Sequence, residues 1–131
     1  MAFLIKEQKQ IFGVTVNSLY GRVNPIVTID GKLFTSVILY INKQAYKARQ
    51  VLNHRFQVIE RIEKYDEITG EPSGEFIEIP KLKDLSQEVV EVGTIENQSE
   101  NYLLLTTEKL IDHLVNIKFI TDRSNVVIDL D

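Results

Sequence analysis

The sequence predicts a mainly β domain: an antiparallel sheet or small β-sandwich or barrel of six to eight strands, carrying two short helices. Several runs alternate apolar and polar residues with a period of two, and Asp30-Gly31 separates two β-branched runs. Only two segments have a helical period. An α+β layer, with one helix packed across one sheet, is the alternative. At 131 residues, 44% apolar and 26% charged, the chain predicts a single globular domain over residues 1–131.

The first predicted elements are strands. Alternating apolar residues from Phe12 to Tyr20 predict a strand over residues 11–20. Residues 23–29 and 32–41 predict a hairpin, and Asp30-Gly31 favours a two-residue type I′ turn. Residues 32–41 are apolar on both faces, which indicates a central strand covered on both sides. Pro25 cannot donate a ladder hydrogen bond, so the first strand should begin at an edge or a bulge.

The period changes after this hairpin. Asn42 is a suitable N-cap, and apolar residues from Ala45 to Leu52 fall on one helical face. We therefore predict a short helix over residues 42–52, laid against the sheet.

A second, longer hairpin is predicted next. Residues 55–65 alternate and precede a turn-rich segment, residues 66–74, after which residues 76–79 are again strand-like. A helix over residues 55–65 is the alternative, since Phe56, Ile59 and Ile62 are three apart. The hairpin tip should be exposed, and Pro80 is expected to end its second strand.

The last third is less regular. Residues 81–98 fit either a helical turn or an extended stretch, and residues 102–105 favour a buried strand. Thr106 or Thr107 is expected to cap a helix over residues 108–117, with an apolar face from Leu110 to Val115. Residues 117–121 and 126–130 should be extended.

Charge is distributed unevenly along the chain, whose net charge is −4. Residues 1–59 hold eight basic and two acidic residues, whereas residues 60–131 hold seven basic and seventeen acidic ones. Such asymmetry favours complementary contacts between molecules. The alternative is that the two halves interleave in the fold and their charges mix on its surface.

The sequence contains no recognisable catalytic or metal-binding motif, and we expect neither an enzyme nor a cofactor. The absence of cysteine excludes disulfides and thiol nucleophiles. The two histidines, His54 and His113, lack neighbours at zinc-ligand spacing, and packing or surface roles are the simpler interpretation. The carboxylates from Glu60 to Glu78 fit no calcium-loop pattern, so a solvated acidic loop is favoured over acid–base or metal chemistry.

Nucleic-acid binding ranks below protein binding. Aromatic and basic residues alternate in the N-terminal half and could stack bases and neutralise phosphates: Tyr20, Arg22, Tyr40, Tyr46, Lys47 and Arg49. The same aromatics fit a core pattern, however, and the whole chain is acidic. No apolar run is long enough for a membrane-spanning helix, and the N-terminal apolar stretch is too short for a secretory signal, so we expect synthesis in a cytoplasm and no membrane.

Residues 33–58 carry a family resemblance. An apolar strand ending in Tyr40 leads into the helix start Asn42-Lys43-Gln44-Ala45, and a further strand follows with Phe56 near its beginning. This arrangement resembles small virion structural proteins of tailed bacteriophages. The resemblance implies a neck, ring, tail or baseplate subunit that forms a homo-oligomer with further structural partners, located in the virion after synthesis in a bacterial cytoplasm.

We therefore predict a non-enzymatic assembly subunit that acts through protein–protein contacts. Its predicted interaction surface combines basic and aromatic residues of the first helix with acidic residues of the hairpin tip: Lys43, Tyr46, Lys47, Arg49, Asp66, Glu67, Glu71 and Glu75. A small cytoplasmic binding or regulatory protein that engages a host protein or nucleic acid is the alternative. An enzyme that uses these carboxylates with a histidine is a third hypothesis.

Overall fold

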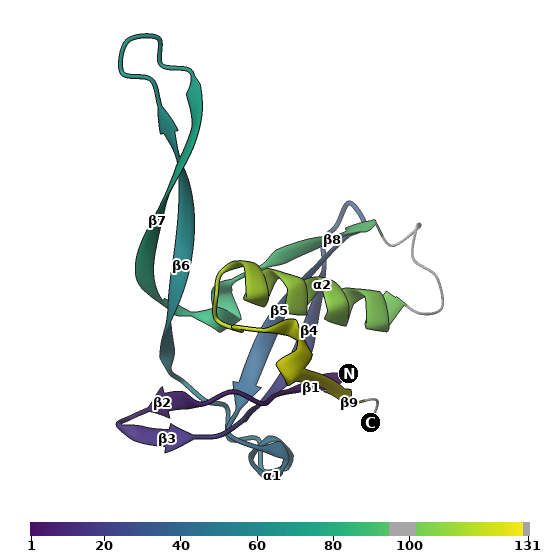
Figure 1. Cartoon of the computed structure of the whole chain (residues 1–131). Helices are drawn as coiled ribbons and strands as arrows, with labels where there is room; N and C mark the ends of the chain where they lie inside the picture. Colours follow the sequence, from purple (N-terminus) through teal and green to yellow (C-terminus); the bar gives the residue numbers. More distant parts are fainter. Residues whose placement is uncertain (95–101, 130–131) are drawn as a thin grey trace.

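The computed structural model describes residues 1–94 and 102–129, which form a mainly β fold with two α-helices (Figure 1). Five antiparallel strands form the main sheet in the order β8-β5-β4-β1-β9. Their bounds are Val90–Thr94 for β8, Lys32–Tyr40 for β5, Leu19–Val27 for β4, Ala2–Ile5 for β1 and Val126–Asp129 for β9. The predicted mainly β class with two short helices is confirmed, with nine described strands instead of six to eight.

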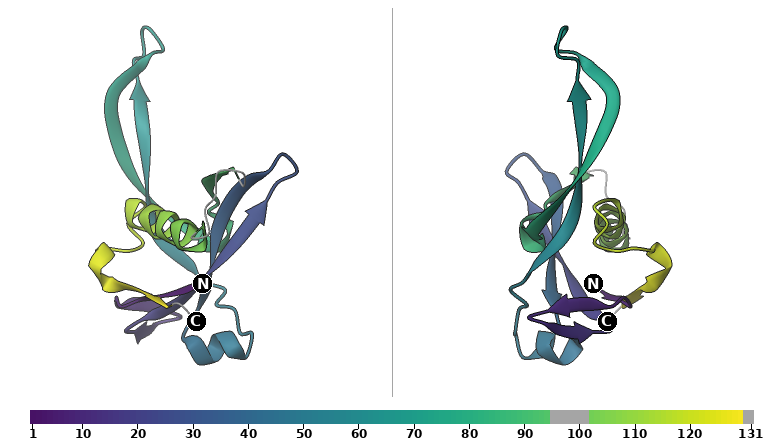
Figure 2. Two further views of the ribbon diagram at one scale, coloured as in Figure 1. Left: turned by 90° about the vertical axis from the view of Figure 1, so that its right-hand side faces the viewer. Right: turned by 60° about the vertical axis from the view of Figure 1, so that its left-hand side comes forward.

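Helix α2, Tyr102–Asn116, lies across one face of this sheet (Figure 2). Its apolar side is fully buried at Leu110, Ile111 and Leu114 and packs with residues from alternate positions of β1 and β5, such as Phe3 and Val37. The approach is close at Gly21, where a Cβ atom would come within 2.8 Å of the Phe3 ring. The main core therefore lies between α2 and the sheet.

The opposite face of the sheet carries a smaller cluster. Ala2, Tyr20 and Tyr40 are buried there, and Ala45 and Tyr46 of α1, Lys43–Lys47, pack against them. Strand side chains alternate between faces, so β5 supplies Val37 and Leu39 to one cluster and Ile38 and Tyr40 to the other. The prediction that this strand is central and covered on both faces is confirmed.

The chain before β4 corrects one expectation, because residues 11–20 are not a single strand. Two short strands, β2 (Lys9–Ile11) and β3 (Val14–Val16), pair with each other across a two-residue turn. Phe12 and Gly13 both have positive φ, 51° and 78°, as a type I′ turn requires. The alternation of apolar residues did not reveal this turn because Phe12 occupies an unusual conformation for an aromatic residue.

The predicted hairpin around Asp30-Gly31 is confirmed, since β4 and β5 pair from Tyr20–Tyr40 to Val27–Leu33. The predicted type I′ turn is wrong, however, because Gly31 has positive φ and Asp30 does not. Thr28 donates its N–H to the Lys32 carbonyl, and Gly31 donates to the Thr28 carbonyl. This is the common three-residue hairpin loop, in which a type I turn is followed by a left-handed glycine. Pro25 lies where β4 extends beyond β1, so its missing N–H faces an unpaired edge.

Helix α1 begins where predicted and is shorter than residues 42–52. The Asn42 side chain accepts a hydrogen bond from the Ala45 N–H, as an N-cap does. Arg49 then adopts a left-handed conformation with φ 57°, while Gln50 and Arg49 donate to the carbonyls of Ala45 and Tyr46. This Schellman arrangement ends the helix before Val51.

The second hairpin is confirmed and is longer than predicted. Strands β6, Arg55–Tyr65, and β7, Pro72–Asp84, form a two-stranded ribbon that projects from the main sheet (Figures 1 and 2). Pro80 does not end β7, because it lies opposite Ile59, whose N–H points away from β7 to the Ile117 carbonyl. In such a non-hydrogen-bonded pair the Pro80 nitrogen also faces outwards, where no donor is needed.

Three expectations for the last third are wrong. Residues 102–105 are the first turn of α2, so Thr106 and Thr107 lie inside the helix and donate their hydroxyls to the carbonyls of Tyr102 and Leu103. Residues 117–121 form turns instead of a strand. Within the ambiguous residues 81–94, β7 continues to Asp84, a 3₁₀ turn (η1, Leu85–Gln87) follows and β8 is extended. Residues 95–98 lie outside the described part, and a 3₁₀ turn (η3, Arg123–Asn125) precedes β9.

Candidate functional site

The predicted interaction residues lie in two groups at opposite ends of the molecule. Lys43, Tyr46 and Lys47 belong to α1, and Arg49 follows it, at the bottom of Figure 1. Asp66, Glu67 and Glu71 lie in the β6–β7 loop, and Glu75 follows in β7, at the top of the same view. One molecule therefore cannot bring the two groups together.

A shallow cationic pocket of about 370 Å³ lies beside α1. Its lining combines two residues of β4 with three of α1: Tyr20, Arg22, Lys43, Tyr46 and Lys47. Tyr20 and Arg22 are two residues apart on one strand, so they share a face, and pairing of Tyr20 with Tyr40 brings both next to α1. We call these five lining residues the cationic pocket.

Aromatic contacts hold this pocket together. The Tyr46 ring lies 5.7 Å from the Tyr20 ring and 5.3 Å from the Tyr40 ring, between ring centroids. Its other contact is the Arg22 guanidinium, whose central carbon is 4.3 Å from the ring centroid. This cation–π geometry holds Arg22 in place while leaving N–H donors for an acceptor outside the protein.

The two lysines of the pocket differ in their ion pairing. The Lys43 ammonium forms an ion pair with Asp129 at 3.2 Å. Lys47 is exposed and, within residues 1–94 and 102–129, forms no ion pair. The hydroxyl of Tyr20 is buried and has no hydrogen-bond partner in the described part of the chain. A buried hydroxyl without a partner is unusual and favours a ligand that accepts from it.

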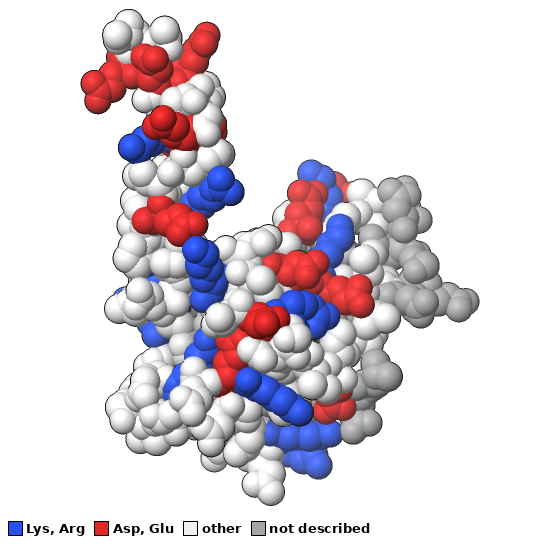
Figure 3. Space-filling view, viewed as in Figure 1, with Lys and Arg blue, Asp and Glu red and all other residues white. Residues whose placement is uncertain are grey.

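The far end of the β6–β7 hairpin is acidic, as Figure 3 shows. Asp66 orders the loop, because its carboxylate accepts the N–H groups of Ile68 and Thr69 at 2.8 and 3.2 Å. Glu67, Glu71 and Glu75 are exposed. We call residues 66–75 the acidic tip, and the hairpin beyond Ile59, residues 60–79, the arm.

The arm also exposes apolar side chains. Ile68 is 95% exposed, and several others are between 38% and 62% exposed: Ile62, Tyr65, Phe76 and Ile77. The Arg61 guanidinium lies 4.0 Å from the Phe76 ring centroid and covers part of one face. Scattered apolar residues are ordinary on a protein surface, but here they share one narrow ribbon.

Ion pairs hold the strands together where the arm begins. Lys81 and Lys83 lie 2.5 and 2.6 Å from the two oxygens of Glu60, and hydrogen bonds from these lysines lower the pKa of Glu60 to about 2. Lys83 also contacts Glu88 at 3.0 Å and lines an open pocket of about 390 Å³. Because its charges are paired with one another, we interpret this cluster as structural.

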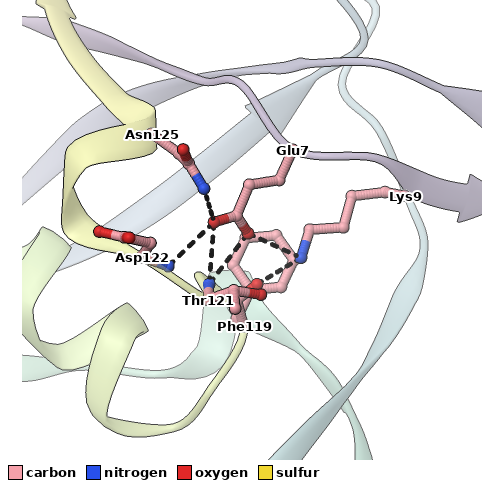
Figure 4. A network of polar contacts seen from close by, with 6 residues as sticks. All are labelled: Glu7, Lys9, Phe119, Thr121, Asp122 and Asn125. Carbon is pink, nitrogen blue, oxygen red and sulfur yellow. Dashed lines mark hydrogen bonds and ion pairs between the residues drawn. The ribbon is translucent and has the colours of Figure 1, made fainter.

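The most enclosed carboxylate of the described ion pairs is Glu7, whose side chain is 7% exposed (Figure 4). It accepts hydrogen bonds from the N–H groups of Thr121 and Asp122 at 2.9 to 3.0 Å and from the Asn125 amide at 2.7 Å. Burial acts to raise the pKa of Glu7, but these hydrogen bonds outweigh it and lower the pKa. Lys9 bridges Glu7 and the Phe119 carbonyl. The network joins the two ends of the chain and is structural.

The two histidines lie in separate surroundings. His54 packs edge-on between the rings of Phe12 and Phe56, with centroids 5.0 and 4.8 Å away. His113 is half-buried on α2, and its Nε2 lies 3.9 Å from a Glu88 oxygen, beyond hydrogen-bond distance. Over residues 1–94 and 102–129, no group of three His, Asp or Glu side chains is placed to hold a metal ion.

Two pocket residues, Tyr20 and Arg22, were absent from the predicted interaction surface. The sequence signal for them was their alternation with Tyr40 and Tyr46, which fitted nucleic-acid stacking as well as a core.

None of the described helices is long and apolar enough to cross a membrane. No protein-family model, curated protein or solved structure matches this chain.

Proposed function

We propose that this protein is a non-enzymatic assembly subunit that associates with further copies of itself through its projecting arm. The observation that carries the proposal is the arm itself. It is a two-stranded ribbon with apolar side chains exposed along its length, and it extends away from the domain core (Figures 1 and 2).

Such a ribbon gains little stability from its own two strands. An isolated two-stranded hairpin is marginally stable in water, and long ribbons gain stability when one face packs on another surface. The arm has cross-strand ion pairs at its base, but residues such as Tyr65 and Phe76 remain 62% and 45% exposed. A neighbouring molecule would cover them, as β-hairpins do at many protein interfaces.

A narrower proposal rests on the sequence resemblance of residues 33–58 to small tailed-bacteriophage virion proteins. On that proposal the assembly is a neck, ring, tail or baseplate structure and the protein is located in the virion. A subunit with different surfaces at its two ends suits a closed ring, because head-to-tail contacts close when the rotation between subunits permits.

The test compares the full chain with an arm-less variant by light scattering after gel filtration. Replacing residues 63–76 with Asn-Gly joins Ile62 to Ile77, which are paired in the ribbon, by a type I′ turn. We expect the full chain to form a defined multiple of its 15.1 kDa protomer mass and the arm-less variant to be a folded monomer.

A matched control removes exposed apolar side chains elsewhere. Val27→Ser with Ile29→Ser alters the β4–β5 hairpin, where these residues are 55% and 109% exposed, and should leave the oligomer unchanged. A full chain that remains monomeric at all concentrations, or an arm-less variant that still assembles, would overturn the proposal.

A further inference from the structure

The cationic pocket has the chemistry of a carboxylate receptor. Tyr20 is 1% exposed and lines it, and its hydroxyl is a donor without an acceptor among the described residues. Arg22 presents guanidinium N–H groups from a position fixed by the Tyr46 ring, and Lys47 adds a second positive charge. Three donors and two charges around a shallow pocket favour an anionic acceptor.

The acidic tip carries matching groups at the other end of the molecule. Glu67, Glu71 and Glu75 are exposed, and the Asp66 cap together with the Ser73 hydroxyl, which donates to the Lys64 carbonyl at 2.8 Å, orders the loop that presents them. From Glu60 to Tyr65 the extended strand β6 spans roughly 17 Å, and the loop that carries Glu67 and Glu71 lies beyond its end. The tip therefore reaches well beyond its own domain.

We propose that the acidic tip of one molecule docks into the cationic pocket of the next. The inference rests on the proposed function and specifies the partner surface of the arm. A glutamate of the tip accepts hydrogen bonds from the Tyr20 hydroxyl and the Arg22 guanidinium, and Lys47 neutralises a second carboxylate. The acidic tip and the cationic pocket lie at opposite ends of one molecule (Figures 1 and 2), so the contact between two molecules is head-to-tail.

Electrostatic complementarity supports this occupant over a phosphate. The tip and the pocket are opposite in sign, and the partly exposed Tyr46 ring beside the pocket provides an apolar surface for Ile68, which is 95% exposed at the tip. A phosphate would use the same donors but would leave the acidic tip and Ile68 without a partner surface.

The experiment is a charge-swap measured by light scattering at about 0.1 M salt, where the screening length is about 10 Å. The tip-reversed protein carries Glu67→Lys and Glu71→Lys, and the pocket-reversed protein carries Arg22→Glu and Lys47→Glu. Each alone faces like charge with like charge, so we expect its association to weaken by about tenfold or more. An equimolar mixture restores every tip–pocket pair with opposite charges and should assemble again.

Control variants reverse two charges elsewhere on the body. Lys6→Glu with Lys32→Glu, and Glu91→Lys with Asp112→Lys, alter exposed residues outside both surfaces and should leave assembly unchanged. Circular dichroism checks that each variant folds. If Arg22→Glu prevents folding, Lys47→Glu alone replaces the pocket-reversed protein in the same mixture.

Tyr20→Phe gives a second readout that a purely structural role would not produce. Removing a buried hydroxyl that lacks a partner should leave the thermal stability of the isolated protomer unchanged or higher, when measured in the arm-less background. In the full chain the same substitution should weaken association, because the carboxylate loses a donor.

The outcomes separate the inference from the proposed function. A wild-type monomer overturns both. A wild-type oligomer that needs the arm, but whose charge-swapped mixture does not assemble, overturns the inference alone. The same holds if pocket reversal leaves the oligomer intact and instead abolishes binding of a short single-stranded oligonucleotide, which would assign the pocket to phosphate.

Discussion

The arm and the rest of the molecule, which we call the body, contain the same strand-forming residue types but use them differently. In β5 most residues are buried, and both faces pack against a helix. In β7 nearly every residue is exposed, although Phe76, Ile77 and Ile79 would suit a core. Composition alone therefore does not distinguish them. In the body apolar residues stabilise the fold, whereas in the arm they are available to another molecule.

The largest expected difference concerns matched isoleucines. Ile111 is fully buried on the sheet-facing side of α2, so Ile111→Ala should lower the free energy of unfolding by about 2–5 kcal/mol through lost burial and a cavity. Ile68→Ala at the acidic tip should change it by less than about 0.5 kcal/mol. Urea denaturation of both full-length variants, under conditions in which the protein is monomeric, measures these changes. Equal losses would contradict the division between body and arm.

Glycines provide the next comparison. Gly21→Ala places a methyl group within 2.8 Å of the Phe3 ring, so the ring must move and stability should fall by about 1–3 kcal/mol. Gly74→Ala in the arm meets no neighbour within 4 Å and incurs only its positive φ of 78°, about 1 kcal/mol. Thermal unfolding distinguishes the two, and a larger loss at Gly74 would show that the arm is packed.

Glutamates differ in the same way. Glu7→Gln weakens hydrogen bonds to a buried carboxylate and should cost about 1–2 kcal/mol at pH 7, whereas Glu67→Gln should cost almost nothing. The pKa of Glu7 is lowered in the folded protein, so its contribution is present above its ordinary value of 4.5 and is lost as the pH falls below it. The difference in stability between wild type and Glu7→Gln, measured from pH 7 to pH 3, should therefore shrink.

The smallest effect concerns left-handed residues. Arg49 has φ 57° at the end of α1, whereas the acidic tip uses Gly70 with φ 71°. Arg49→Gly should stabilise the protein by about 0.5–1 kcal/mol, and Gly70→Ala should destabilise the tip by a similar amount. Differential scanning calorimetry is sensitive enough for the first change. A loss of stability in Arg49→Gly would indicate that the arginine side chain contributes to the fold.

The sequence was most informative where local signals agree. Asn42 capped a helix as expected, and the turn-rich segment from Asp66 to Gly74 predicted an exposed hairpin tip. The sequence was misleading where a local preference was ambiguous. Thr106 was expected to cap a helix because threonine hydroxyls often do so, but its hydroxyl donates to the Tyr102 carbonyl inside a longer helix.

The candidate site was only half accessible to sequence reasoning. The residues of α1 and the acidic tip could be named from composition, but the pocket depends on the pairing of Tyr20 with Tyr40, twenty residues apart, in a defined register. Whether Arg22 lies over Tyr46 is decided by that register. Local periodicity carries no information about it.

Pro80 has a consequence for how the β6–β7 ribbon behaves at high concentration. A long, flat, unpaired strand edge is a template for adding strands from other molecules without limit, which leads to fibrillar aggregation. The outward edge of β7 lacks a donor at Pro80, so an incoming strand cannot form a continuous ladder there. The residue that was predicted to end the strand instead limits how other chains can attach to it.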